Sequence, residues 1–217
     1  MSLFKILLAI HIVCGGASLL LGAYILAVKK GSRQHRLFGS VYFYAMLLAA
    51  IMALLMSCIH PNYFLFIIGV LTAYLLLSGR RYIHKKAGQG PSIFDWSLTV
   101  IILLFGLALI LLGVYNIIGS NLFGIVFVVF GSGAIFFAYQ DWQHFRGKAK
   151  IKNYYLTTHL QRMTGSYIAA LTAFLVVNNK ILPGILAWLL PSLLLVPVII
   201  RLTIKYKVDK HSADTLV

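Results

Sequence analysis

Glutamate is absent from the 217-residue sequence, and the only four acids are aspartates, at positions 95, 141, 209 and 214. Against them stand 19 lysines and arginines, which give a formal net charge of +15. Charged residues make up only 11% of the chain, and hydrophobic residues make up 61%. An ordinary soluble domain is about a quarter charged and less than half apolar. The composition therefore excludes that class and indicates a protein that crosses a membrane several times.

Cysteine is also scarce, and the two thiols, Cys14 and Cys58, lie in apolar runs at different expected depths. We therefore expect two buried thiols rather than a disulfide. In a soluble protein, a charge of +15 would suggest nucleic acid as a partner. Here the basic residues lie in short segments between apolar runs, which predicts contact with anionic membrane lipid and no nucleic-acid partner.

Seven apolar segments are long enough to cross a hydrocarbon layer of roughly 30 Å, which needs about 20 helical residues each. None shows the strict alternation of a barrel strand, so the segments should be helices. We predict an all-α polytopic membrane protein with seven transmembrane helices. The expected spans are residues 4–28, 37–59, 63–80, 95–117, 121–143, 158–178 and 182–204. Residues 1–206 would form the transmembrane domain and residues 207–217 a polar cytoplasmic tail.

Basic residues follow every second span. Four lie after each of the first, third, fifth and seventh spans, and only Lys5 and Lys180 lie on the alternate side. Lysine and arginine accumulate in cytoplasmic loops, so this bias predicts an outer N-terminus and an inner C-terminus. The turns expected outside, at residues 60–62 and 119–121, are short. They predict that the second and third spans, and the fourth and fifth, are antiparallel neighbours.

Two segments that open apolar spans share a motif in which an arginine lies three residues before a Gly-Ser pair. The pairs are Arg36 with Gly39-Ser40 and Arg162 with Gly165-Ser166. The spans that precede these segments run in the same direction. The motif therefore predicts a parallel repeat of the first three and last three spans, with the fourth as connector.

Ionisable residues at membrane depth are costly, which makes them candidate functional residues. Arg162 lies about one turn inside its span and needs a carboxylate, for which Asp141 is the first choice and Asp95 the second. We predict a cytoplasm-facing polar cluster between the second, fifth and sixth spans. Its members are His35, Arg36, Asp141, His159 and Arg162, with His11, Tyr42 and Asp95 as secondary candidates.

Four interpretations of this cluster stay open. It binds a small anion, an ion or a polar ligand, with or without transport, through Arg36 and Arg162. It holds zinc through His35, His144 and His159, or haem through two of them. It is a hydrolase in which Asp141 and His159 activate water, which leaves enzymatic activity open. It is a purely structural latch with no ligand. The sequence contains no H-E-x-x-H, C-x-x-C or G-x-S-x-G motif.

Several pieces of the chain are similar to a known family. They are His11-Ile12-Val13-x-Gly15, Lys30-Gly31-Ser32-x-x-His35-Arg36-x-x-Gly39-x-x-Tyr42, His60-Pro61-Asn62, Asp141 before a basic loop, and His159-Leu160-x-Arg162-Met163. On these the chain resembles the bacterial membrane proteins grouped as domain of unknown function 2306. The resemblance implies a bacterial cytoplasmic (inner) membrane location and directs first tests to the histidines, arginines and aspartate just quoted. A looser likeness to di-haem cytochromes b keeps a haem protein as the alternative.

Overall fold

The computed structural model describes residues 3–84, 89–148 and 153–207, and these residues form seven α-helices and no strand. All seven are long and apolar enough to cross a membrane, so the predicted all-α, seven-span architecture is confirmed. Of the predicted tail, only Lys207 lies within the described residues. The helices are α1 (Leu3–Ala27), α2 (Arg33–Ile59), α3 (Tyr63–His84), α4 (Ile93–Ile118), α5 (Gly124–Phe145), α6 (Tyr154–Asn178) and α7 (Gly184–Tyr206).

The helices differ most from the predicted spans at the ends rich in basic residues. There α2 begins four residues earlier than expected, α3 ends four residues later and α6 begins four residues earlier. Hydropathy ends a span at its first charged residues, but long basic side chains let a helix continue into the interface. The side chain of Ser32 also caps α2 by accepting the N–H of His35 at 3.1 Å. The added turns bring His35, Arg36 and His84 into helices.

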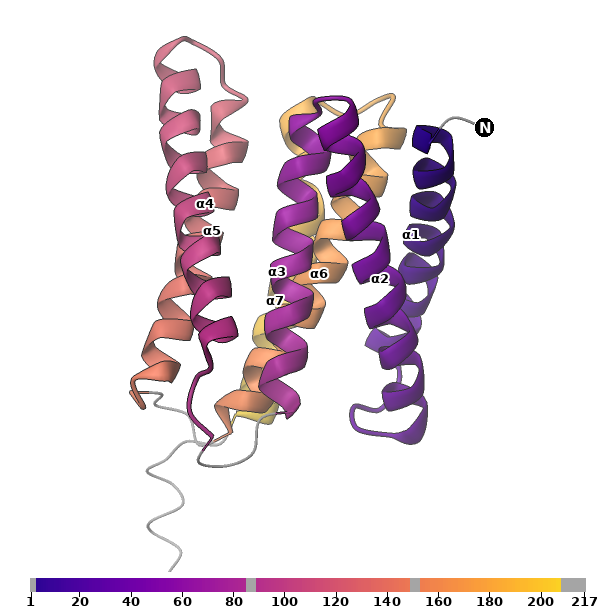
Figure 1. Cartoon of the computed structure of the whole chain (residues 1–217), viewed down its shortest axis with the longest axis vertical. Coiled ribbons are helices and arrows are strands. Elements are labelled where there is room, and N and C mark those ends of the chain that lie inside the picture. The colour runs from indigo at the N-terminus through magenta and orange to yellow at the C-terminus, as the bar shows by residue number, and fades with distance from the viewer. Residues whose placement is uncertain (1–2, 85–88, 149–152, 208–217) are drawn as a thin grey trace, which may run out of the picture.

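The helices form three neighbouring groups (Figure 1): α4 with α5, then α3 with α6 and α7, then α1 with α2. As predicted, α2 packs against α3, and α4 packs against α5. The repeat of the first three and last three spans stays a prediction. In the structure α1 packs along α2, whereas α5 packs along α4 rather than along α6.

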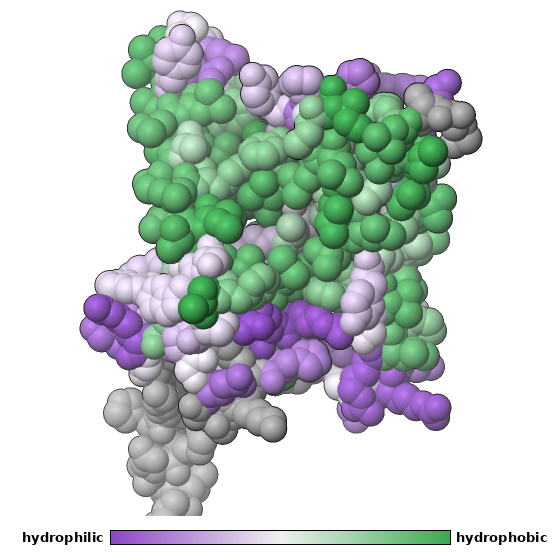
Figure 2. All heavy atoms as spheres, in the orientation of Figure 1, coloured by the Kyte–Doolittle hydropathy of each residue, from purple (hydrophilic) through white to green (hydrophobic). Residues whose placement is uncertain are grey.

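On the face that Figure 2 shows, a hydrophobic belt lies between two more hydrophilic ends. We call the end at which α1 and α3 finish the basic end, since it carries Lys30, Arg36, Arg80, Arg81 and Arg146. Under the belt, Trp188 of α7 is buried edge-on against Phe64, Phe123 and Phe130. Both cysteines are free, and Cys58 is exposed rather than buried as expected, because the outward side of a membrane helix is also apolar in sequence.

Glycines bring α4 and α5 into backbone contact. A Cβ added at Gly131 would lie 2.8 Å from the carbonyl oxygen of Gly106, and one at Gly106 would lie 2.9 Å from that of Gly131. About two helical turns away, Gly113 and Gly124 approach each other's backbone in the same reciprocal way. Small residues are what allow membrane helices to pack this closely. The α4–α5 hairpin is therefore a unit that meets the rest of the bundle through α3, α6 and α7.

Candidate functional site

A buried carboxylate joins three helices near the basic end. Asp141 of α5 is 2% exposed, and its Oδ1 accepts hydrogen bonds from Tyr82 Oη and from Arg162 Nη2, both at 2.9 Å. Its Oδ2 accepts a short hydrogen bond from Tyr74 Oη. Both tyrosines lie on α3 and the arginine on α6. With the hydroxyl of Thr99 on α4, at 3.3 Å from Oδ2, the carboxylate has four donors from three neighbouring helices, and a buried charge needs such partners.

Arg162 is fully buried, at 0% exposed. Besides Asp141, its Nη2 donates to the carbonyl oxygen of Phe137 at 3.1 Å, and its guanidinium lies 4.1 Å from the centre of the Phe137 ring. Its Nε and Nη1 atoms are buried without a hydrogen-bond partner among the described residues. The predicted pairing of Arg162 with Asp141 is thus present, in dry aromatic packing. Such a pair fixes helix register, as the latch interpretation expects.

Asp95, the second-choice partner, belongs to a different network. It forms a salt bridge with Arg81 and a capping box with Ser92 at the start of α4. Arg81 is 36% exposed and Asp95 is 6% exposed, so a buried carboxylate is paired here with a partly exposed guanidinium. Thr99 Oγ1 links the two networks, at 3.0 Å from the Asp95 carbonyl oxygen and 3.3 Å from Asp141 Oδ2. The Thr99 hydroxyl has one proton, which it can donate to only one of these two oxygens at a time.

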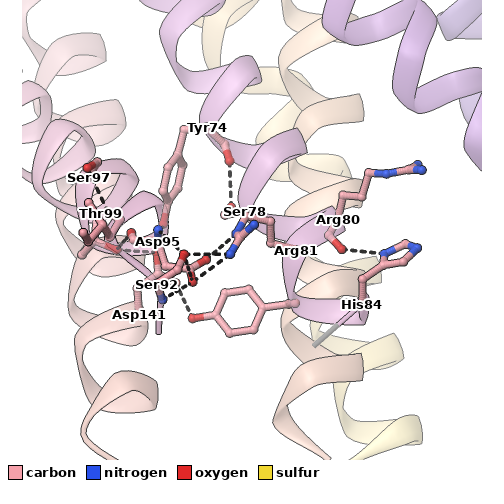
Figure 3. Close-up of polar contacts among 12 residues, drawn as sticks. Tyr74, Ser78, Arg80, Arg81, His84, Ser92, Asp95, Ser97, Thr99 and Asp141 are labelled. Carbon is pink, nitrogen blue, oxygen red and sulfur yellow. Dashed lines mark hydrogen bonds and ion pairs between the residues drawn. The ribbon is translucent and has the colours of Figure 1, made fainter. Parts of the chain in front are cut away.

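Arg80 and Arg81 are adjacent in sequence but point to opposite sides of α3 (Figure 3). Arg81 points toward α4, where Asp95 and Ser92 bind it. Arg80 points toward α2, and its guanidinium lies over the rings of Phe43 and Tyr44, at 4.4 and 5.0 Å from their centres. No described aspartate pairs with Arg80. On the side of α3 that faces α4, the charge of Arg81 is therefore balanced by Asp95. On the side that faces α2, no described carboxylate balances the charge of Arg80.

That unmatched side faces a cavity of about 310 Å³ at the basic end. Residues of α1, α2, α3 and α6 line it. The predicted pocket between α2, α5 and α6 is therefore divided: His35, Arg36 and His159 line the cavity, whereas Asp141 and Arg162 lie in the buried network. The reason is α3, which packs on α6 and offers its tyrosines to Asp141 and its Arg80 to the cavity.

The charge on the cavity wall is of one sign. Lys30, Arg36 and Arg80 line it, and among the residues that the structure describes no aspartate does. Their hydrogen bonds go to neutral acceptors: Lys30 Nζ to the carbonyls that end α1, Arg36 Nη1 to the carbonyl of Gly31, and Arg80 Nη2 to Tyr44 Oη. Burial lowers the pKa of Lys30. An anion in the cavity would compensate this charge.

Three imidazoles also line the cavity, from His35, His84 and His159. His159 Nδ1 lies 2.9 Å from the carbonyl oxygen of Gly79, and His35 Nδ1 is buried without a partner among the described residues. His144, predicted to join a metal site, lies instead beside Tyr82 Oη at 3.1 Å. Across residues 3–84, 89–148 and 153–207, no three His, Cys, Asp or Glu side chains are grouped as a metal ion would need.

The cavity ends at a polar contact between α2 and α6. Tyr42 Oη and Ser166 Oγ are 2.8 Å apart, and both side chains are buried. Since Ser166 donates its proton to the Met163 carbonyl oxygen, Tyr42 is the donor. Neither Ser166 nor Asn178 lines the cavity, so it does not continue to the opposite end. Of the other secondary candidates, His11 bonds the carbonyl oxygen of Ala49 at 2.9 Å, as a packing histidine would.

Sequence reasoning missed residues in both places. Tyr74, Ser78 and Tyr82 lie four residues apart on one face of α3, and this polar stripe in an apolar span was a usable signal for the Asp141 site. In sequence, Lys30 and Arg80 count as topology signals, because basic residues at span ends usually do. His84 lies outside the predicted cluster. The hydrolase arrangement is not assembled, since none of the groups that bind Asp141 is His159.

Replacing Tyr82 with phenylalanine tests the Asp141 network. We expect the free energy of unfolding to fall by roughly 1.5–3 kcal/mol, the range for a hydrogen bond to a charged group. Unfolding by sodium dodecyl sulfate in mixed micelles, followed by circular dichroism, measures it. Tyr139→Phe is the matched control, because its exposed hydroxyl accepts a hydrogen bond from Gln143 and has no other partner among the described residues. Equal losses in the two variants would contradict a special role for Tyr82.

The chain matches no family model, no curated protein and no solved structure. The resemblance to domain of unknown function 2306 stays a prediction. The class that the fold defines is a seven-helix, multi-pass membrane protein. Its function has to be inferred from the cavity and the buried pair.

Proposed function

We propose that this membrane protein binds an anion in the cavity at the basic end. The observation that carries the proposal is the one-signed wall: Lys30, Arg36 and Arg80 meet there without an aspartate among the described lining residues. Uncompensated charge in a half-buried cavity costs free energy, which a bound anion recovers. The imidazoles of the wall add neutral or cationic donors, and the unpartnered Nδ1 of His35 is one such group.

The location supports an intracellular ligand. We propose that the basic end faces the cytoplasm of a bacterial cell and that the protein lies in its cytoplasmic membrane, since positive loops stay inside. The cavity opens at that end. Its described lining does not extend past Tyr42 and Tyr167 toward the opposite end, so binding is better supported than conduction.

The Asp141–Arg162 network has a separate role in this proposal. It is dry and satisfied at the carboxylate, and it joins α3, α5 and α6 where the cavity wall is built. Arg162 lies between His159 and Met163 on α6, and both of these line the cavity. The latch therefore holds the wall in place, and the cavity binds the ligand.

Thermal unfolding of the detergent-solubilised protein, in phosphate against chloride at fixed ionic strength and pH, tests anion binding. A ligand that binds only the folded state raises the unfolding temperature with its concentration. We expect phosphate to raise the unfolding temperature of the native protein. The Arg36→Gln and Arg80→Gln variants should need at least tenfold more phosphate for the same rise. Arg201→Gln is the control, since this exposed arginine of α7 does not line the cavity. Equal phosphate responses in all four proteins would overturn the proposal.

A further inference from the structure

The cavity is larger than a simple anion needs, and much of its wall is apolar. Ile25, Leu26, Ile83, Leu160 and Met163 line it together with the cations. Its volume of about 310 Å³ is at the lower end of the range for pockets that hold drug-sized molecules. An inorganic anion would leave these apolar walls in contact with water, which is unfavourable. The wall fits a molecule that has an anionic head and an apolar part.

A second cavity adjoins the first. It measures about 280 Å³ and is lined by Phe43, Leu77, Arg80, Arg81, His84 and Gln89. Phe43, Arg80 and His84 line both cavities. Since Phe43 lies on α2 and Leu77 on α3, the second cavity lies at the seam between these two helices. Arg80 therefore lies in the wall that the first cavity, from here on called the chamber, shares with the cavity at the α2–α3 seam.

The seam follows from how the two helices are joined. A turn of three residues connects α2 to α3 at the end opposite the basic end. From there the helices diverge toward the basic end, as Figure 1 shows, and both cavities lie where they have separated. The lining of this seam is partly apolar, through Phe43 and Leu77, so it can hold a hydrocarbon chain. An apolar chain can thus leave the chamber sideways into the membrane.

Three cationic groups around one chamber favour a doubly charged head. A phosphate monoester carries a charge of about −1.5 to −2 at pH 7 and three acceptor oxygens. Arg36 and Arg80 can each bind two such oxygens, and Lys30 supplies a point charge. Arg80 is held by aromatic faces and one tyrosine hydroxyl rather than by a carboxylate, so it can turn toward a phosphate at little cost.

We infer that the ligand is an amphiphilic phosphate monoester. Its phosphate is bound by Arg36, Arg80 and Lys30, and its apolar chain leaves between α2 and α3. The inference rests on the proposed anion site and adds the chain and its exit. The same phosphate chemistry occurs in a free ion and in a lipid head group, and the chain distinguishes the two.

Calorimetric titration of the full chain in phosphatidylcholine nanodiscs tests it, with dodecyl phosphate as the probe and empty nanodiscs as the blank. We expect dodecyl phosphate to bind at least tenfold more tightly than inorganic phosphate and than dodecanol. Arg36→Gln and Arg80→Gln should weaken dodecyl phosphate at least tenfold, and Arg201→Gln should not change it. Leu77→Trp fills the seam and should weaken dodecyl phosphate while leaving inorganic phosphate unchanged, which also shows that this variant is folded.

The outcomes separate the two proposals. If inorganic phosphate binds as tightly as dodecyl phosphate, or if Leu77→Trp has no effect, the anion site stands and the amphiphile is overturned. If neither phosphate binds, both proposals fall. If dodecanol binds as tightly as dodecyl phosphate, the chamber is a plain apolar site and the anion site falls with the inference.

Discussion

Replacing Arg162 with alanine is expected to lower the free energy of unfolding by about 3–5 kcal/mol, the cost of stranding one partner of a buried ion pair. Asp141, which is 2% exposed, would keep the hydroxyls of Tyr74 and Tyr82 but lose the one cation that pairs with it among the described residues. Unfolding in mixed micelles with sodium dodecyl sulfate measures the loss. We expect this to be the largest effect of any single truncation at the basic end.

The double variant Arg162→Ala with Asp141→Asn isolates the cause. Asparagine removes the stranded charge, so the double variant should be more stable than Arg162→Ala alone. If it is no more stable, the pair is not what holds α5 to α6. Arg201→Ala is a control within the same chain, because this exposed arginine of α7 pairs with no described aspartate and its loss should change the free energy of unfolding by at most about 0.5 kcal/mol.

The same double variant separates the latch from the cavity. Arg162 and Asp141 do not line the cavity, whereas His159 and Met163, which flank Arg162 along α6, do. A double variant that folds should therefore keep its affinity for phosphate. Loss of phosphate binding with folding intact would show that the two parts act as one site.

The buried Arg162–Asp141 pair could be predicted from sequence, because it depends on the scarcity of acidic residues and on the depth of Arg162 in its span. The chain offers few acids near a span, Arg162 lies inside its span, and a buried guanidinium needs a carboxylate. Choosing Asp141 over Asp95 was correct because Asp95 has its own local partner in Ser92, three residues earlier, which makes it a cap. Depth and local chemistry are both readable along the chain.

The cavity could be predicted only in part, since it depends on which helices are neighbours. His35, Arg36 and His159 are predicted as members of one cluster with Asp141, and the structure places these three around one cavity that Asp141 does not line. Only the position of α3 separates them, and seven apolar spans of similar length do not encode their lateral order. Arg80 shows what the sequence does not encode. In sequence it is one of two arginines at a span end. In the structure it points toward α2, whereas Arg81 points toward α4 (Figure 3).

The α4–α5 hairpin yields the second large prediction. Replacing Gly131 with leucine should lower the free energy of unfolding by about 3 kcal/mol, the upper end of the usual cost of overpacking. A Cβ at this position would lie 2.8 Å from the Gly106 carbonyl oxygen, which is backbone and cannot rotate away. The helices would have to separate, and Gly113 and Gly124 would lose their contact as well.

Gly133→Leu is the matched control, two residues along the same helix. A Cβ there meets nothing within 4 Å, so the variant gains the same helix propensity without the clash. The difference between the two leucine variants in unfolding by sodium dodecyl sulfate therefore isolates the backbone approach. Equal stability would mean that α4 and α5 do not depend on their glycines. A loss at Gly131 alone would make the hairpin a rigid support, against which Asp141 can be held at a fixed distance from Arg162.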